Sequence, residues 1–383
     1  LEEPLLFARH HLESKQCNLK SPLAEQVGRA LNIPLTRDIK REEAISYIME
    51  YNVQDETYNA TIHELAKLEF NRLQRVHQKE LKAISLWWKD LYGDVKLDYA
   101  RDRVVECYFW SYSCVYEEEY ARSRIVLAKL LMLTSLLDDT YDEHATLEEC
   151  QVLTKVLERW DETDVSLLPE YLQKFFLRVI SNFRDFEQEL EPHEKYRSAY
   201  IRNVFQDISK SYLQEAEWSH HGYIPSFNDQ VNVSVKSAGG ELVAIGLLFG
   251  LGDVATKEVF EWAIRNSDTV RAVGQVSRFM DDLADFKRGR NKMDVATSVE
   301  CYMKENNVTS EVALAKIASL VDDAWKTSNK ELIEHRAILP IVKQITNFGR
   351  SMMFLYHGKR DGYTDSKEVK VALESHFVKP IPI

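Results

Sequence analysis

Apolar residues recur along most of the chain at the three- and four-residue spacing of an α-helix. The clearest example is one continuous stretch that contains seven apolar residues at this spacing: Ile125, Leu127, Leu130, Leu131, Leu133, Leu136 and Leu137. The alternation of apolar and polar residues between turn signals that is typical of β-strands is absent from the sequence. The pattern therefore predicts an all-α protein, in which a bundle of helices packs around an apolar core.

Gly239 and Gly240 interrupt an otherwise helical stretch over residues 231–249. Glycine weakens a helix interior, so the pair predicts a break or bend, and backbone carbonyls freed there could face a cation. Close packing of two helices at small residues would explain the pair equally well. The sequence leaves both interpretations open.

Composition and net charge argue against some classes of partner. Of the 383 residues, 49 are Lys or Arg and 61 are Asp or Glu, so the formal net charge is 49 − 61 = −12. That sign argues against partners such as nucleic acid or an anionic membrane surface. The longest uncharged apolar stretches, such as residues 242–252, are shorter than the roughly 18 residues that span a bilayer, so no membrane span is expected.

Five cysteines, an odd number without CxxC spacing, indicate neither a disulfide framework nor a zinc site. We therefore expect a reducing, cytoplasmic location. The chain begins at Leu1 without a methionine, which is the pattern of a processed or truncated start.

The long apolar stretch ends in an acidic cluster, DDTYD at residues 138–142. Unpaired carboxylates on a largely buried helix are costly, so partners are expected. At about 100° per residue, Asp138 and Asp142 project from nearly one face, and Asp139 points away as a supporting residue. Carboxylate oxygens suit Mg²⁺, which proteins commonly hold by one or two carboxylates together with substrate phosphate oxygens.

A second cluster, DDLAD at residues 281–285, repeats the spacing with Asp281, Asp282 and Asp285. Two carboxylate pairs on facing helices would bind a diphosphate and its metal ions between them. A single acidic cluster is more often a solvated helix end, but two clusters that each follow apolar residues favour a metal site.

Four basic residues are candidates for binding the diphosphate. Arg101 and Arg103 precede a strongly apolar helix, and Arg278 lies three residues before Asp281, on the same helix face. The planar guanidinium group suits diphosphate oxygens. Lys292 is a weaker candidate, and surface ion pairs are the alternative for all four residues.

Trp110, Tyr356 and Tyr363 have electron-rich rings that stabilise a cation without offering a nucleophile. Aromatic residues in helices more often serve the core. Tyr356 and Tyr363, however, flank the glycine-bearing segment 357–362, which is typical of a loop that closes over a site and excludes water.

Together these residues resemble the plant terpene synthases, in the sesquiterpene synthase branch of the angiosperm type. The resemblance covers essentially the whole chain and rests on RDR at 101–103 before VVECYFW, DDTYD at 138–142, the Asp281-Asp282 cluster, VATSVECYM at 295–303 and DGYT at 361–364. It implies the class I terpenoid synthase helical bundle. Residues 68–383 would form the catalytic α-helical domain, and residues 1–67 the C-terminal part of an N-terminal helical domain that is otherwise missing.

The resemblance also implies an activity: ionisation of farnesyl diphosphate with Mg²⁺, then cyclisation of the carbocation to a sesquiterpene hydrocarbon or alcohol, with release of diphosphate. It implies three Mg²⁺ ions, for which Mn²⁺ can substitute, and a monomer acting on a small prenyl diphosphate. Metal binding falls to Asp138, Asp142 and Asp281, with Asp139 and Asp282 in support. Diphosphate binding falls to Arg101, Arg103 and Arg278, beside the weaker candidate Lys292 named above. Guidance of the cation, proton transfer and coverage of the site fall to Trp110, Tyr356, Asp361 and Tyr363.

The chain departs from the family in the second metal motif. The family pattern is Asn or Asp, then Ser or Thr four residues on, then Glu eight residues on, whereas this chain has Asp285 and Gly289 at the last two positions. We hypothesise that Asp285 supplies the missing charge and binds metal, with water at the vacant coordination position. An Asp285→Ser variant that behaved like the parent would contradict this hypothesis.

The same departure creates a second DDxxD, the paired signature of chain-elongating prenyltransferases. A prenyltransferase is therefore one alternative, and a catalytically impaired, diphosphate-binding helical protein is another. The Arg101 and Arg103 pair, the surroundings of Trp110 and the C-terminal tyrosines favour the cyclase.

Overall fold

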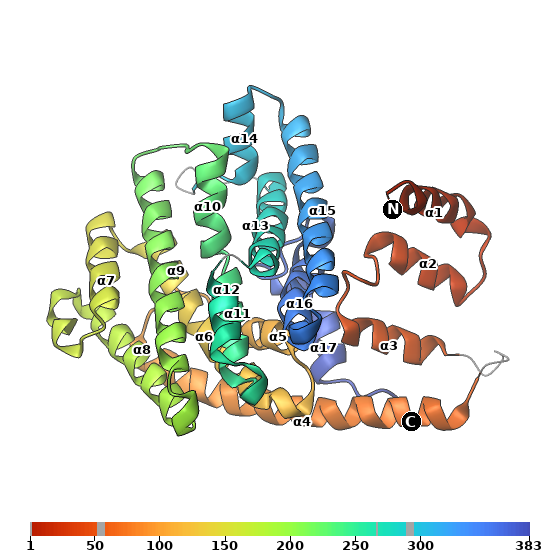
Figure 1. Cartoon of the computed structure of the whole chain (residues 1–383), viewed down its shortest axis with the longest axis horizontal. Coiled ribbons are helices and arrows are strands. Elements are labelled where there is room, and N and C mark those ends of the chain that lie inside the picture. The colour runs from red at the N-terminus through yellow and green to blue at the C-terminus, as the bar shows by residue number, and fades with distance from the viewer. Residues whose placement is uncertain (1, 52–57, 266, 289–294) are drawn as a thin grey trace. The chain divides into compact units, whose positions relative to one another are not determined.

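The computed structural model describes residues 2–51, 58–265, 267–288 and 295–383, and every regular element in these ranges is a helix (Figure 1). The predicted all-α fold is thereby confirmed for the described part of the chain. Lys292 and Gly289, named from the sequence, lie outside the described residues. The contacts within the chain divide it into two compact units, Leu1–Val76 with Lys370–Ile383, and His77–Val369.

The first unit contains α1 (Glu2–Lys15), η1 (Gln16–Asn18), α2 (Leu23–Asn32), α3 (Lys40–Glu50), the beginning of α4 (Ala60–Val95) and α17 (Lys370–Phe377). Its small core holds Ile48, Phe70 and Ile381. The Asn71 amide exchanges two hydrogen bonds of 2.8 Å with the backbone of Ile381. The last residues of the chain are therefore part of this unit.

The sequence-based domain boundary between residues 67 and 68 differs from this division, which falls at Val76 and His77 and assigns the C-terminal segment to the first unit. The helix α4 continues without a break through both positions, so no local signal in the sequence marks the boundary. The pairing of Asn71 with Ile381, which assigns the C-terminal segment to the first unit, joins residues that are far apart in sequence. The boundary at 67 stays a proposal about the family's domains.

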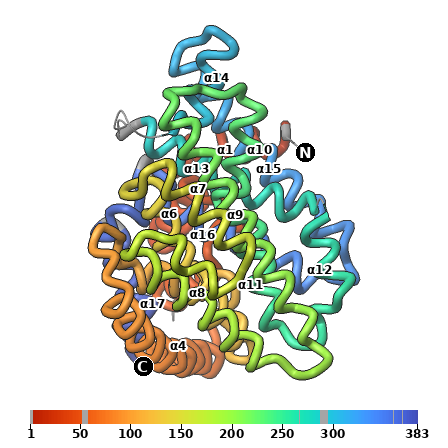
Figure 2. Tube along the Cα trace, turned by 90° about the vertical axis from the view of Figure 1, so that its left-hand side faces the viewer, coloured from red at the N-terminus to blue at the C-terminus, as the bar shows by residue number. Residues whose placement is uncertain are grey.

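The second unit holds the other helices: α5 (Val104–Cys114), η2 (Glu118–Tyr120), α6 (Ala121–Asp139), η3 (Thr140–His144), α7 (Leu147–Arg159), η4 (Glu162–Leu167), α8 (Glu170–Gln188), η5 (Pro192–Glu194), α9 (Arg197–His220), α10 (Phe227–Ser237), α11 (Gly240–Gly250), η6 (Gly252–Val254), α12 (Lys257–Ile264), α13 (Asp268–Arg288), α14 (Ser298–Asn306), α15 (Ser310–Glu334), η7 (Arg336–Ile338), α16 (Leu339–Tyr356), η8 (His357–Lys359) and η9 (Ser366–Glu368). Within it, α6 packs against α5 and α11, while α13 packs against α15 and α16. Figure 2 traces the chain in a view turned by 90° from Figure 1.

A buried ion pair joins α4, α5 and α6. The fully buried guanidinium of Arg124 donates to both carboxylate oxygens of Glu80 at 2.7 Å, and the Tyr108 hydroxyl donates to the same carboxylate at 2.7 Å. Because a buried charge without a partner is strongly destabilising, this network fixes how α6 and α5 pack. Both helices line the site described below.

The predicted break at Gly239 is present: α10 ends at Ser237, α11 begins at Gly240, and Gly239 has a φ of 79°, which glycine adopts without strain. The alternative explanation also holds, because a Cβ on Gly240 would lie 3.0 Å from the Gly274 Cα of α13. The pair therefore both breaks the helix and permits close helix packing. The combined stretch Phe227–Gly250 is long and apolar enough to cross a bilayer, but 72% of its most apolar window is buried, as expected of a core helix.

Candidate active site

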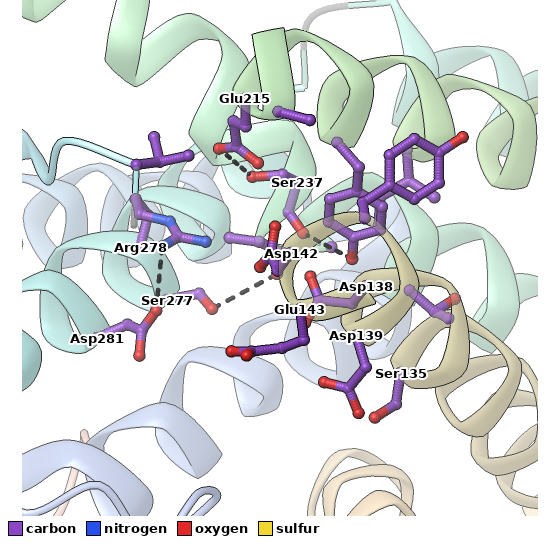
Figure 3. A pocket seen from close by; sticks show the side chains of 18 of the residues that line it. Ser135, Asp138, Asp139, Asp142, Glu143, Glu215, Ser237, Ser277, Arg278 and Asp281 are labelled. Carbon is purple, nitrogen blue, oxygen red and sulfur yellow. Dashed lines mark hydrogen bonds and ion pairs between the residues drawn. The ribbon is translucent and has the colours of Figure 1, made fainter. Parts of the chain in front are cut away.

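A cavity of about 790 Å³ opens in the second unit and is lined by both acidic clusters. Its walls come from α5, α6 with the turn after it, α9, the break between α10 and α11, α13 and α16 with the segment that follows. Figure 3 shows Asp138 and Asp142 on one side of this space and Arg278 and Asp281 on another. The two clusters, far apart in sequence, thus face one cavity.

On the first wall, Asp139 has a different role from its neighbour. Its carboxylate is 1% exposed and accepts the Arg101 backbone N–H at 2.6 Å and the Nε–H at 2.8 Å. The Arg101 guanidinium also donates to Asp138 at 3.2 Å. Asp139 therefore holds Arg101 at the cavity, and the Asp138 side chain retains 29% exposure toward it.

The local geometry after α6 differs from the regular helix assumed from the sequence. The α-helix ends at Asp139, and residues Thr140–His144 form a π turn, closed by the Ala145 N–H donating to the Thr140 carbonyl at 2.9 Å. Asp142 lies in this turn. Because a π turn has more residues per turn than an α-helix, the argument from 100° per residue does not describe how Asp142 is placed. Such turns are rare and frequently occur at functional sites.

On the second wall, the guanidinium of Arg278 donates to Asp281 at 3.0 Å and to Asp282 at 3.3 Å. Asp282 is 1% exposed and accepts the Ser298 N–H, at the start of α14, at 2.7 Å. One acid of the pair thus faces the cavity, and its neighbour anchors the arginine and α14. The first wall has the same arrangement, in which Asp138 faces the cavity and Asp139 holds Arg101.

Glu215 of α9 also lines the cavity, and the sequence argument missed it. It is 8% exposed and accepts a hydrogen bond of 2.8 Å from the Ser237 hydroxyl (Figure 3). A signal did exist: Glu215 continues the apolar stripe of α9 formed by Ile201, Ile208 and Tyr212, where a carboxylate is out of place. An acid on an apolar stripe indicates a buried site.

The cavity disfavours the ionised form of several of its carboxyl groups, which raises their pKa values. Burial raises the pKa of Asp138 to about 6, against the favourable charge of Arg101, and raises the pKa of Glu215 to about 7. Burial, followed by the Asp138 charge, also raises the pKa of Asp142 well above its usual value. For Asp281, burial raises the pKa and the Arg278 charge opposes the rise. Such shifts are typical of functional sites.

These residues fit divalent magnesium. Bound cations would offset the burial of negative charge that, with smaller contributions from neighbouring carboxylates, raises the pKa values of Asp138, Asp142 and Asp281. Carboxylate oxygens are the ligands Mg²⁺ prefers. Among the described residues, no three His, Cys, Asp or Glu side chains are grouped closely enough to hold an ion by themselves. Ions shared between one or two carboxylates and a diphosphate match that arrangement.

Aromatic rings cover another side of the cavity. The rings of Trp110 and Tyr363 stack with centroids 4.5 Å apart and planes at 24°, and the Arg101 guanidinium lies 5.0 Å from the Tyr363 centroid. The Tyr363 hydroxyl shares a 2.6 Å hydrogen bond with Ser135 of α6. The orientation of the Tyr363 ring is thereby fixed on three sides.

The segment after α16 closes over this wall. Asp361 accepts the N–H groups of Tyr363 at 3.0 Å and Thr364 at 2.8 Å, which holds the segment as a tight turn. Arg103 donates to the Thr364 carbonyl at 2.8 Å, and it is not among the residues that line the cavity. Tyr356, at the end of α16, is 7% exposed and lines the cavity. The structure thus places Arg103 against this segment, outside the cavity lining.

Most of the other sequence-predicted residues meet at the same cavity. The lining includes Arg101, Trp110, Asp138, Asp139, Asp142, Arg278, Asp281, Asp282, Asp285, Tyr356, Asp361 and Tyr363. Their assignment to individual roles stays a prediction.

Comparisons with known proteins agree with this geometry. Residues 89–327 match the model of the terpene synthase family, metal binding domain. The chain is 62% identical to tau-cadinol synthase and 59% identical to alpha-copaene synthase, both from Zea mays, over its whole length and over 70% and 73% of theirs.

Two solved structures have the same fold over the whole chain. Isoprene synthase of grey poplar (Populus x canescens), in complex with three Mg²⁺ ions and dimethylallyl-S-thiolodiphosphate, superposes with a TM-score of 0.90 at 30% identity over 73% of its length. Limonene synthase with 2-fluorolinalyl diphosphate superposes with a TM-score of 0.92 at 29% identity over 71% of its length. By its family match, its relatives and the acidic walls of its cavity, the chain belongs to the terpene synthase family.

Proposed function

We propose that this protein is a sesquiterpene synthase, which ionises farnesyl diphosphate with Mg²⁺ and cyclises the carbocation to a hydrocarbon or alcohol. The observation that supports this most directly is that Asp138 of α6 and Asp281 of α13 line one cavity together with Arg101 and Arg278. The printed names of the Zea mays relatives support a fifteen-carbon substrate.

Asp138, Asp142, Asp281 and Asp285 would hold the metal ions, and Glu215 adds a carboxylate to the same lining. Bound Mg²⁺ supplies positive charge that polarises the diphosphate and stabilises it as a leaving group. The complex of isoprene synthase with three Mg²⁺ ions supports the same number here. We further propose that Mn²⁺ substitutes and that the protein acts as a cytoplasmic monomer.

Arg101 and Arg278 bind the diphosphate oxygens in this mechanism. Each guanidinium is already held by a buried carboxylate, Arg101 by Asp139 and Arg278 by Asp282, so little reorganisation is needed when negative charge develops on the leaving group. Fixed positive charge also keeps the diphosphate from recombining with the cation. Diphosphate departs as the carbon–oxygen bond breaks, and the chain provides no nucleophile.

The stacked rings of Trp110 and Tyr363 then face the positive charge left on the hydrocarbon, because the face of an aromatic ring attracts a cation. The turn held by Asp361 keeps Tyr363 over the cavity, and Arg103 secures that turn. A covered cavity excludes water, which would otherwise capture the cation before cyclisation.

Incubation with farnesyl diphosphate and Mg²⁺, with and without isopentenyl diphosphate, tests the proposal. A cyclase releases diphosphate and a volatile fifteen-carbon product from farnesyl diphosphate alone, and Asp281→Asn should reduce release by at least about 100-fold. Arg265→Gln, an exposed substitution immediately after α12, serves as the matched control. Turnover that requires isopentenyl diphosphate, or no diphosphate release at all, would refute the proposal.

A further inference from the structure

Two tyrosine rings from separate segments pack against the π turn that contains Asp142. Tyr99, from the segment between α4 and α5, stacks on His144 of the turn with centroids 4.0 Å apart and planes at 8°. Tyr171 of α8 meets the His144 ring edge-on at 5.1 Å and 83°. His144 is thus the contact between the turn and the two tyrosines.

Tyr99 also holds the turn by its hydroxyl group. The Tyr99 and Thr140 hydroxyl oxygens are 2.9 Å apart, and the fully buried Thr140 hydroxyl donates to the Leu136 carbonyl at 2.6 Å. Since Thr140 uses its proton for Leu136, Tyr99 is the donor. One tyrosine therefore contacts both the first residue of the π turn and the last.

Both ends of the turn are anchored further. Two residues after Tyr99, the Arg101 backbone donates to Asp139, immediately before the turn. On the far side, the Tyr171 hydroxyl donates to Glu149 at 3.2 Å, and Glu149 also accepts the Thr146 N–H at 2.9 Å as part of the capping box of α7. The turn is consequently held from α8 and from the segment that contains Arg101.

An anchored turn matters because the π geometry is not the default. A π turn contains one more residue than an α-helical turn and is rare, so its backbone path differs from that of a continued α-helix. Asp142 is the cavity acid inside the turn. The position of its carboxylate in the cavity therefore depends on the backbone of this turn staying in place.

We propose that Tyr99 and His144 are positioning residues, whose stacked pair keeps the π turn in place and so holds Asp142 toward the bound metal and diphosphate. The inference rests on the proposed function. Neither residue lines the cavity, so their effect passes through the turn. The same pair also couples the turn to Arg101, the proposed diphosphate ligand two residues after Tyr99.

Calorimetric titration of the whole protein with inorganic pyrophosphate in the presence of Mg²⁺ tests this inference. Tyr99→Leu and His144→Ala should each weaken binding by about 3- to 30-fold, as expected when a group that supports a ligand is lost. His144→Tyr retains a stacking ring and should bind within about twofold of the parent. His11→Ala, which removes an exposed histidine stacked on Phe7 in the first unit, is the matched control and should change nothing.

Hydrogen exchange of residues 140–146 in the metal-free protein provides a second measurement. Tyr99→Leu and His144→Ala should accelerate exchange in this segment, where the Ala145 N–H closes the π turn, and leave α11 unaffected. Unchanged pyrophosphate binding in both variants would overturn the inference alone, as would weaker binding without faster exchange. A parent protein that binds no pyrophosphate with Mg²⁺ would overturn the proposed function and the inference with it.

Discussion

Asp138 and Asp139 are adjacent in sequence, but Asp138 faces the cavity whereas Asp139 is buried against Arg101. Replacing each by asparagine is predicted to change the free energy of unfolding of the metal-free protein in opposite directions. The folded protein raises the pKa of Asp138 to about 6 from its ordinary value of 3.8, chiefly by burial. At about 1.4 kcal/mol per pKa unit, the difference corresponds to at most about 3 kcal/mol.

The sign follows from proton binding. Because the folded protein holds the Asp138 proton more tightly than the unfolded chain, its contribution to stability is lost as the pH rises from about 4 to about 6. Asp138→Asn removes the ionised group. Since the side chain is 29% exposed and also loses its contact with Arg101, we expect a gain of about 1–2 kcal/mol at pH 8 and none near pH 4.

Asp139→Asn is the matched control. Its buried carboxylate accepts two short hydrogen bonds from Arg101, so loss of the charge should destabilise the fold by about 1–3 kcal/mol at pH 8. Both variants should lose most of their catalytic activity.

Urea unfolding of the parent and both variants, with EDTA present, at pH 8 and pH 4, measures these changes. A stabilised Asp138→Asn protein beside a destabilised Asp139→Asn protein at pH 8 is the expected result. Changes of the same sign for both variants at pH 8 would refute the account of the cavity electrostatics.

Three further predictions concern other parts of the chain. Ser135→Ala removes the 2.6 Å hydrogen bond to Tyr363 and should alter the product distribution in gas chromatography, while diphosphate release stays within about threefold of the parent. Chelation by EDTA should abolish diphosphate release, and Mg²⁺ should restore it; release that persists would rule out metal dependence. In the first unit, burial raises the pKa of Asp38 to about 6, so parent stability falls as the pH rises from about 4 to about 6. Asp38→Asn, which keeps an acceptor for the Ile39 N–H, should therefore gain up to about 1 kcal/mol at pH 8 in urea unfolding, and a loss would contradict this.

The all-α fold could be predicted because helical periodicity is a local property of the sequence, read directly from the spacing of apolar residues. The two acidic clusters could also be recognised from the sequence, because carboxylates that follow an apolar helix are costly to bury without a partner. Neither argument requires knowledge of how distant segments meet.

What the sequence did not provide depends on non-local packing. The π turn at Thr140–His144 is stabilised by Tyr99 and Tyr171, which are distant in sequence, so a fixed 3.6-residue period cannot reveal it. Glu215 interrupts the apolar stripe of α9, which indicates a buried site, but which site it joins depends on the packing of α9 beside Ser237. In the same way, the contact of Arg103 with Thr364 joins residues that are far apart in sequence.

Gas chromatography of the products from farnesyl and geranyl diphosphates, each incubated with the protein and Mg²⁺, tests the central claim most directly. The account predicts cyclic fifteen-carbon products from farnesyl diphosphate, formed with release of one diphosphate per product molecule. Intact farnesyl diphosphate after prolonged incubation, with no product from either substrate, would contradict it.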